Sequence, residues 1–156
     1  MSPTGTTGTW PTGSTVNTFV DTGAWYAVAD RSDRHHGRAS QFYLAHATEN
    51  RLVTSDLIVA ETWTLLASHL GRAAAMTFWE TLRDGRVPIL TIEASDLEAA
   101  WRIAQEFADQ DFSFTDCASF ALMERLGLED VFAFDAHFLV YRYGSNRRRA
   151  FRRHPA

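Results

Sequence analysis

Two short apolar runs that each end in an aspartate constrain the fold of this chain more than any other feature of its sequence. The first is "TFVD", which ends at Asp21, and the second is "FAFD", which ends at Asp135. Between them, strand-like runs such as "RLVTS" and "VPILTI" alternate with segments of helical periodicity. This alternation predicts a mainly parallel sheet flanked by helices, so we expect an α/β fold.

Length and composition indicate one domain with two unusual ends. The chain has 156 residues, 46% of them apolar, which suffices to bury a single core. The Thr- and Gly-rich residues 1–15 predict a flexible leader, and we place the ordered domain at residues 16–144. Residues 145–156 hold an arginine cluster, which predicts either a solvated tail or a local phosphate-binding segment.

Within the domain, hydrophobic periodicity indicates where helices and strands lie. The helix near residue 95 is expected to begin with a capping box of Ser95 and Glu98. Strands are expected at 16–20, 51–55, 87–92 and 131–135, with 87–92 buried and an edge strand at 138–144. Helices are expected at 22–30, 35–50, 56–70, 72–85, 95–110 and 114–127.

Several classes of protein are excluded by what the chain lacks. It has no lysine, because all 15 basic residues are arginine, whereas P-loops and Schiff-base enzymes need a lysine side chain. Cys117 is the only cysteine, so no intramolecular disulfide can form, and it has the surroundings of a packed side chain. No signal peptide or run of about 18 apolar residues is present, so we expect a cytoplasmic protein with no membrane partner.

Asp116, in "DFSFTDCASF", admits two interpretations. Ser113 and Asp116 have the spacing of a capping box at a helix start, where a carboxylate is also favoured by the helix dipole. The second interpretation is a functional site, because ligands of open parallel sheets bind outside the carboxyl ends of the strands. Asp21 and Asp135 are expected at that edge, and Asp116 begins a helix beside it.

Glu61 is the fourth acid that the sequence singles out. It lies in the apolar helix candidate "DLIVAETWTLLASHL", with Leu57, Ile58 and Leu65 at helical spacing. A carboxylate within an apolar stripe is expected to be buried. Burial requires a partner such as an arginine, a hydrogen-bond donor or a metal ion.

Four carboxylates without a zinc-like His or Cys spacing favour a hard cation, Mg²⁺ or Mn²⁺, over zinc. The six histidines are scattered along the chain. Such a metal site, open to water, is typical of phosphodiester hydrolysis. Ser113 and Thr115 are then candidates for positioning water or phosphate, although each also suits a helix cap.

The stretches "VDTGAWYA", "VAETWTLL", "FSFTDCASFALMERLG" and "VFAFDAHF", in this order, resemble the PIN-domain family and specifically its VapC-type toxin ribonucleases. The resemblance covers about residues 16–144. It implies a three-layer α/β/α fold and places Asp21, Glu61, Asp116 and Asp135 around one or two Mg²⁺ or Mn²⁺ ions. Asp111 is an extra acid whose role is left open.

The resemblance also implies endoribonuclease activity on structured RNA, a homodimer, and a cognate antitoxin that blocks the site in a type II toxin-antitoxin pair. Three alternatives remain at this point. A receiver or phosphatase domain would share the strand-end aspartates but usually needs a lysine. A PIN-like domain acting on DNA and an RNA-binding domain without cleavage are the other two.

Overall fold

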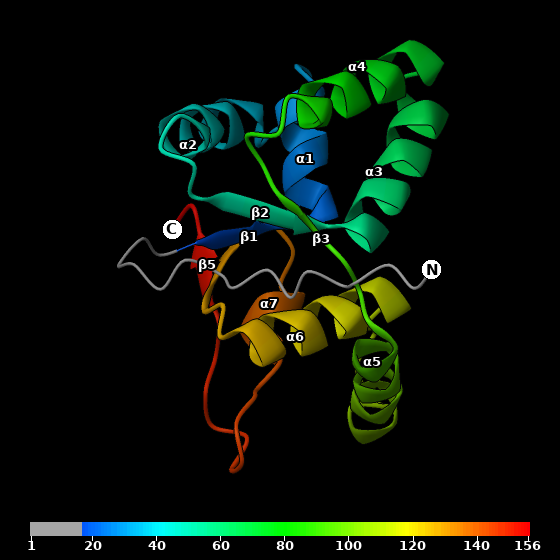
Figure 1. Ribbon diagram of the computed structural model, residues 1–156, viewed down its shortest axis with the longest axis vertical. Coiled ribbons are helices and arrows are strands. Elements are labelled where there is room, and N and C mark those ends of the chain that lie inside the picture. The colour runs from blue at the N-terminus through cyan, green and yellow to red at the C-terminus, as the bar shows by residue number, and fades with distance from the viewer. Residues whose placement is uncertain (1–16) are drawn as a thin grey trace, which may run out of the picture.

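A parallel sheet between two helical layers forms the part of the chain that the computed structural model describes, residues 17–156 (Figure 1). Its strands follow the order β3-β2-β1-β4-β5. They are β1 (Thr18–Val20), β2 (Leu52–Ser55), β3 (Ile89–Leu90), β4 (Asp130–Phe132) and β5 (Arg152–His154).

Seven helices among the described residues cover the two faces of the sheet (Figure 1). On one face lie α1 (Thr22–Ala29), α2 (His36–Ala47), α3 (Asp56–His69) and α4 (Arg72–Arg83). On the other lie α5 (Ala94–Glu106), α6 (Phe114–Leu126) and α7 (His137–Val140). The α/β/α architecture predicted from the sequence is therefore confirmed. None of the helices in residues 17–156 is long and apolar enough to span a membrane.

The two aspartate-terminated runs become neighbouring central strands. Strands β1 and β4 pair in parallel with Val20 opposite Phe132, and the backbone N–H of Asp21 donates to the Phe132 carbonyl at 3.0 Å. Because β2 lies on one side of β1 and β4 on the other, the strand order reverses here. Such a reversal opens a crevice at the carboxyl ends of the strands.

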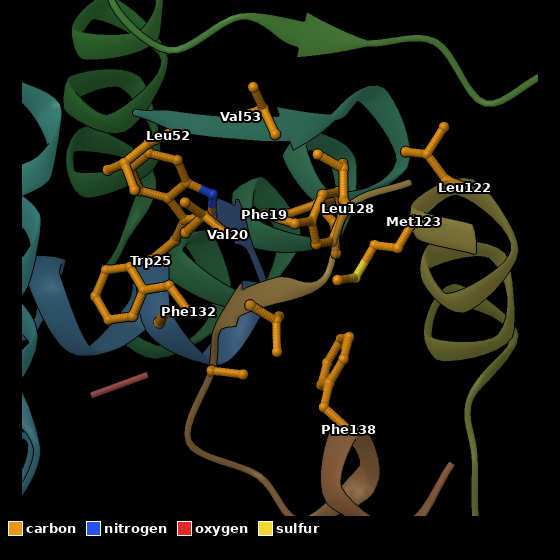
Figure 2. Packing of buried hydrophobic residues seen from close by; sticks show 14 of the residues in the cluster. Phe19, Val20, Trp25, Leu52, Val53, Leu122, Met123, Leu128, Phe132 and Phe138 are labelled. Carbon is orange, nitrogen blue, oxygen red and sulfur yellow. The ribbon is translucent and has the colours of Figure 1, made fainter. Parts of the chain in front are cut away.

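The core lies on both sides of these strands (Figure 2). Phe19 and Phe132 are fully buried, as are Met123 of α6 and Phe138 of α7. On the other face Trp25 of α1 packs edge-on against Phe78 at 5.4 Å between ring centroids. Burial of each large side chain contributes about 1.5–3 kcal/mol, so this core holds the site-bearing strands and helices in fixed positions.

Two elements differ in detail from their sequence predictions. The buried strand expected at 87–92 is only Ile89–Leu90, and Ile89 is 37% exposed because β3 is an edge strand paired with β2 alone. Helix α5 begins at Ala94, and its capping box consists of Glu93 and Asp96 rather than Ser95 and Glu98.

The C-terminal segment also differs from its prediction. The sequence predicts an edge strand at 138–144 and a separate arginine-rich tail at 145–156. Instead, residues 137–140 form α7, and the last strand is β5, paired in parallel with β4. Arg152 forms a bidentate ion pair with buried Asp130 at 2.9 and 2.8 Å, and Phe151 is 3% exposed. The predicted leader, residues 1–15, lies outside the described residues.

Candidate active site

Asp21 and Asp135 both lie at the carboxyl edge of the sheet, as their strand-end positions predict. Asp21 follows β1 directly and is the N-cap residue of α1. Its side chain is buried, with the residue 4% exposed. Asp135 follows β4 after two further residues and is more exposed than Asp21, so it forms the open side of the site.

Asp116 lies in the first turn of α6, where the predicted helix cap is present. Its Oδ2 accepts a hydrogen bond from the Ser113 backbone N–H at 2.9 Å, while its own N–H donates to Ser113 Oγ at 3.0 Å. This is the predicted capping box. The same Oδ2 also lies 2.7 Å from Nδ1 of His137, so the helix cap belongs to a wider polar cluster.

Asp116, Asp135 and His137 bring their ligand atoms together. One such atom from each residue lies within 4.8 Å of those of the other two, close enough for a shared metal ion. The backbone N–H of His137 donates to Asp135 Oδ1 at 2.9 Å, which fixes the short loop between β4 and α7. The donor set, two carboxylates and one imidazole beside Asp21, fits a divalent cation.

The charges of these acids act on one another. Burial raises the pKa of Asp21 well above its ordinary value, the charges of Asp135 and Asp116 raise it further, and Glu61 adds a smaller effect. Burial also raises the pKa of Asp116 and the Asp135 charge adds to this, while the Ser113 N–H and His137 oppose the shift. Carboxylates held together in this way destabilise each other's charged forms unless a cation neutralises them.

Glu61 faces the same region but not as predicted. The sequence predicts a buried carboxylate, whereas Glu61 is exposed. The buried residues of α3 are Ile58, Thr62 and Leu66, and Glu61 lies beside this stripe rather than in it. It lines an open groove of about 490 Å³, whose walls are Leu57, Ala60, Glu61, Thr64, Leu65, Ser68 and Thr115.

The structure also places the remaining residues that the sequence singled out. Thr115 is a wall of the groove beside Glu61, and Asp111 is exposed in the loop before α6. Cys117 is buried, and burial followed by the Asp116 charge raises its thiol pKa to about 11, which agrees with its interpretation as a packed side chain. His137 was missed, because its partner Asp116 is distant in sequence and no ligand spacing marks it.

A comparison with protein families matches the PIN domain over residues 18–142. The chain belongs to the PIN domain family. Within this family it is similar to the 23S rRNA-specific endonuclease VapC20 of Mycobacterium tuberculosis, with 32% identity over 120 residues, or 77% of this chain and 90% of VapC20. It is also similar to ribonuclease VapC26 of the same organism, with 27% identity over 125 residues, covering 80% and 91% of the two chains. This PIN domain protein is therefore of the VapC type.

Solved structures agree with this assignment. The crystal structure of M. tuberculosis VapC20, described as a sarcin-ricin loop cleaving toxin, superposes with a TM-score of 0.72 and 30% identity, covering 77% of this chain and 91% of VapC20. PAE2754 from Pyrobaculum aerophilum superposes with a TM-score of 0.56 at 21% identity, covering 80% and 83%, and shares the fold.

Proposed function

We propose that this VapC-type protein is an endoribonuclease that hydrolyses RNA phosphodiester bonds at the cluster of Asp21, Glu61, Asp116 and Asp135. The observation that carries the proposal is the convergence of Asp116, Asp135 and His137, whose ligand atoms lie within 4.8 Å of one another beside buried Asp21. The names of VapC20 and VapC26 as RNA-cleaving proteins support the choice of RNA over DNA.

The cluster fits one or two Mg²⁺ or Mn²⁺ ions, which Asp21, Asp116 and Asp135 would hold with Glu61 on the groove side. Most of the donors are carboxylate oxygens, which suit these hard cations. A cation of this kind lowers the pKa of a bound water and stabilises negative charge on phosphate oxygens. The raised pKa of Asp21 supports the same assignment, since burial and the charges of Asp135 and Asp116 cause it.

Other residues of this chain would orient the reactants. His137 holds the Asp116 carboxylate by its Nδ1 contact of 2.7 Å. Thr115 lines the groove beside Glu61, and its hydroxyl would donate to a phosphate or a water there. The hydroxyls of Thr64 and Ser68, which line the same groove, already donate to the carbonyls of Ala60 and Leu65. The scissile phosphate would lie between the exposed side of Asp135 and this groove.

As part of the same proposal, the protein is the toxin of a type II toxin-antitoxin pair, acts in the cytoplasm as a homodimer, and is inhibited by a cognate antitoxin. The support is its similarity to VapC20, whose solved structure is that of a toxin. Ribosomal RNA is the first substrate to test, because VapC20 is a 23S rRNA-specific endonuclease.

The test is cleavage of labelled RNA and labelled DNA of the same sequence, with Mg²⁺, with Mn²⁺ and with excess EDTA. We expect RNA cleavage with either metal and none with EDTA, because the carboxylates alone would repel the phosphate. Cleavage that persists in EDTA would exclude the metal-dependent mechanism. Cutting of DNA alone, or RNA binding without cutting, would replace the proposed function by one of its two alternatives.

A further inference from the structure

Arg153, in strand β5, reaches the loop that carries Asp135. Strand β5 pairs with β4 so that Arg153 lies opposite Val131. Its guanidinium donates from one Nη to the carbonyl oxygens of Phe134 at 3.2 Å and of Asp135 at 2.9 Å. A half-buried cation therefore lies against the backbone of the loop that carries Asp135.

Within the described residues Arg153 has no acidic partner, unlike three of the other C-terminal arginines. Among residues 17–156 no carboxylate lies within 4.0 Å of Arg153, and the same holds for Arg142 and Arg148. Arg147 is paired with Glu106, Arg149 with Glu129, and Arg152 with Asp130. A guanidinium has five N–H donors, and the two carbonyl contacts use only one nitrogen. The other donors have no hydrogen-bond partner among residues 17–156.

A second cation lies beside the same loop. The His35 ring stacks on Phe134 with 4.4 Å between centroids and 10° between planes, and Arg34 Nε donates to His35 Nε2 at 3.1 Å. Arg34 is exposed and has no carboxylate within 4.0 Å in the described part of the chain. Asp33, which precedes Arg34 in the sequence, accepts a hydrogen bond from the backbone N–H of His35 instead of pairing with Arg34.

We propose that Arg34 and Arg153 form a cationic rim on the Asp135 side of the cluster, which binds RNA phosphates flanking the phosphate that is cut. The inference rests on the proposed function and names the residues that hold its substrate. The cluster itself is acidic, so it repels the neighbouring phosphates of the same strand. Arginine suits this task because its planar donors match phosphate oxygens bidentately.

The rim is tested by the salt dependence of RNA binding. The probe is an unmodified RNA hairpin kept in excess EDTA, in which no cleavage is expected, and binding is measured by fluorescence anisotropy over a series of KCl concentrations. For a single strand, each lost phosphate contact reduces the slope of log K against log salt by about 0.7. We expect that reduction in both Arg34→Ala and Arg153→Ala, and the parent slope in Arg153→Lys.

Arg148→Ala is the matched control. Arg148 is also exposed, and it directly follows the turn of residues 144–147, whose Gly144 N–H donates to Glu124 at 3.3 Å. Glu124 is eight residues after Asp116 in α6, about 12 Å further along the helix. Removing this arginine changes the net charge equally but leaves the rim intact, so the slope should equal that of the parent.

Two further measurements separate the possible failures. Thermal stabilisation by Mn²⁺ should be unchanged in Arg34→Ala. If Arg153→Ala loses this stabilisation but keeps the parent salt slope, Arg153 acts only on the Asp135 loop and the rim is overturned. If the parent cuts the unmodified hairpin while both alanine variants keep its slope, the rim alone fails. A parent that neither binds nor cuts RNA would overturn the proposed function as well.

Discussion

Asp116 is both a capping residue and a member of the acidic cluster. Its carboxylate closes a capping box with Ser113, and the same oxygen lies against His137 in the acidic cluster. The helix start thereby fixes the carboxylate in position, because the capping bond leaves the side chain little freedom to rotate. A residue that caps its own helix is well suited to hold a metal ion in a reproducible geometry.

The two roles of Asp116 can be separated by Asp116→Asn. The amide oxygen can still accept from the Ser113 N–H, so the helix cap is retained. We expect cleavage to be abolished and the thermal stabilisation by Mn²⁺ to be lost, because the metal loses a charged ligand. Without metal the variant should be at least as stable as the parent, since like charges about 4 Å apart repel by about 1–4 kcal/mol.

Asp109→Asn is the control for this change, because Asp109 is an exposed acid outside the cluster. It should behave like the parent in both cleavage and melting. An Asp116→Asn variant that remains active would mean that Asp116 is only a helix cap. A loss of about 3–5 kcal/mol without metal would instead indicate a broken buried ion pair.

At the scale of single residues, the sequence predicts some contacts and misses others. Asp21 and Asp135 could be placed because each follows a strand, and parallel strands end at one edge. Glu61 was predicted to be buried because it has apolar neighbours, but the helical rotation that orients α3 depends on packing against distant elements. His137 was missed because its contact with Asp116 joins two segments that only the folded chain brings together.

At the level of elements, the long helices were the most predictable. Helix α6 begins and ends within a residue of its predicted bounds, because Ser113 caps it and Gly127, in the left-handed region at φ 68°, ends it. Strand β5 has no such signal. Its sequence is charged, and it becomes a strand because Asp130 at the start of β4 provides a buried partner for Arg152.

Arg152→Ala tests this pairing. Asp130 is 4% exposed, and the variant leaves its carboxylate with His154 at 2.8 Å but without the bidentate arginine. Loss of a partner to a buried acceptor costs about 1–3 kcal/mol, and the exposure of Arg152 favours the lower part of this range. Urea unfolding near neutral pH should detect the loss, whereas Arg148→Ala should unfold like the parent.

The pH dependence of this loss has a definite sign. Burial alone would raise the pKa of Asp130, but hydrogen bonds from Arg152 and then His154 outweigh it and lower the pKa. A carboxyl group whose pKa is lower in the folded state than in the unfolded state stabilises the fold at pH values above its ordinary pKa of about 3.9. This stabilisation is lost as the pH falls through the lowered pKa. The difference between parent and Arg152→Ala should therefore shrink below about pH 4. A constant difference would show that Asp130 does not cause it.

For the whole molecule, the fold holds acids together that would otherwise separate. Neighbouring strands β1 and β4 fix Asp21 and Asp135 at the same edge of the sheet. Helix α6, which covers the face opposite α1, brings Asp116 to them. The fully buried side chains of both faces hold this frame (Figure 2). The fold class followed from strand and helix alternation, but strand β5 did not, because its sequence resembles a charged tail.

Removal of residues 145–156 shows whether that segment belongs to the domain. The truncation deletes β5, leaves β4 as an edge strand and leaves buried Asp130 without either basic partner. It also removes Phe151, which stacks on Tyr143 at 4.6 Å, and loss of a buried Phe side chain alone costs about 3–5 kcal/mol. Because a domain is stable by only about 5–15 kcal/mol, we expect a protein that melts far below the parent or does not fold.

Phe151→Ala in the full chain should give an intermediate melting temperature, which separates lost packing from lost strand pairing. A truncated protein with the parent's melting temperature would show that residues 145–156 are a tail after all.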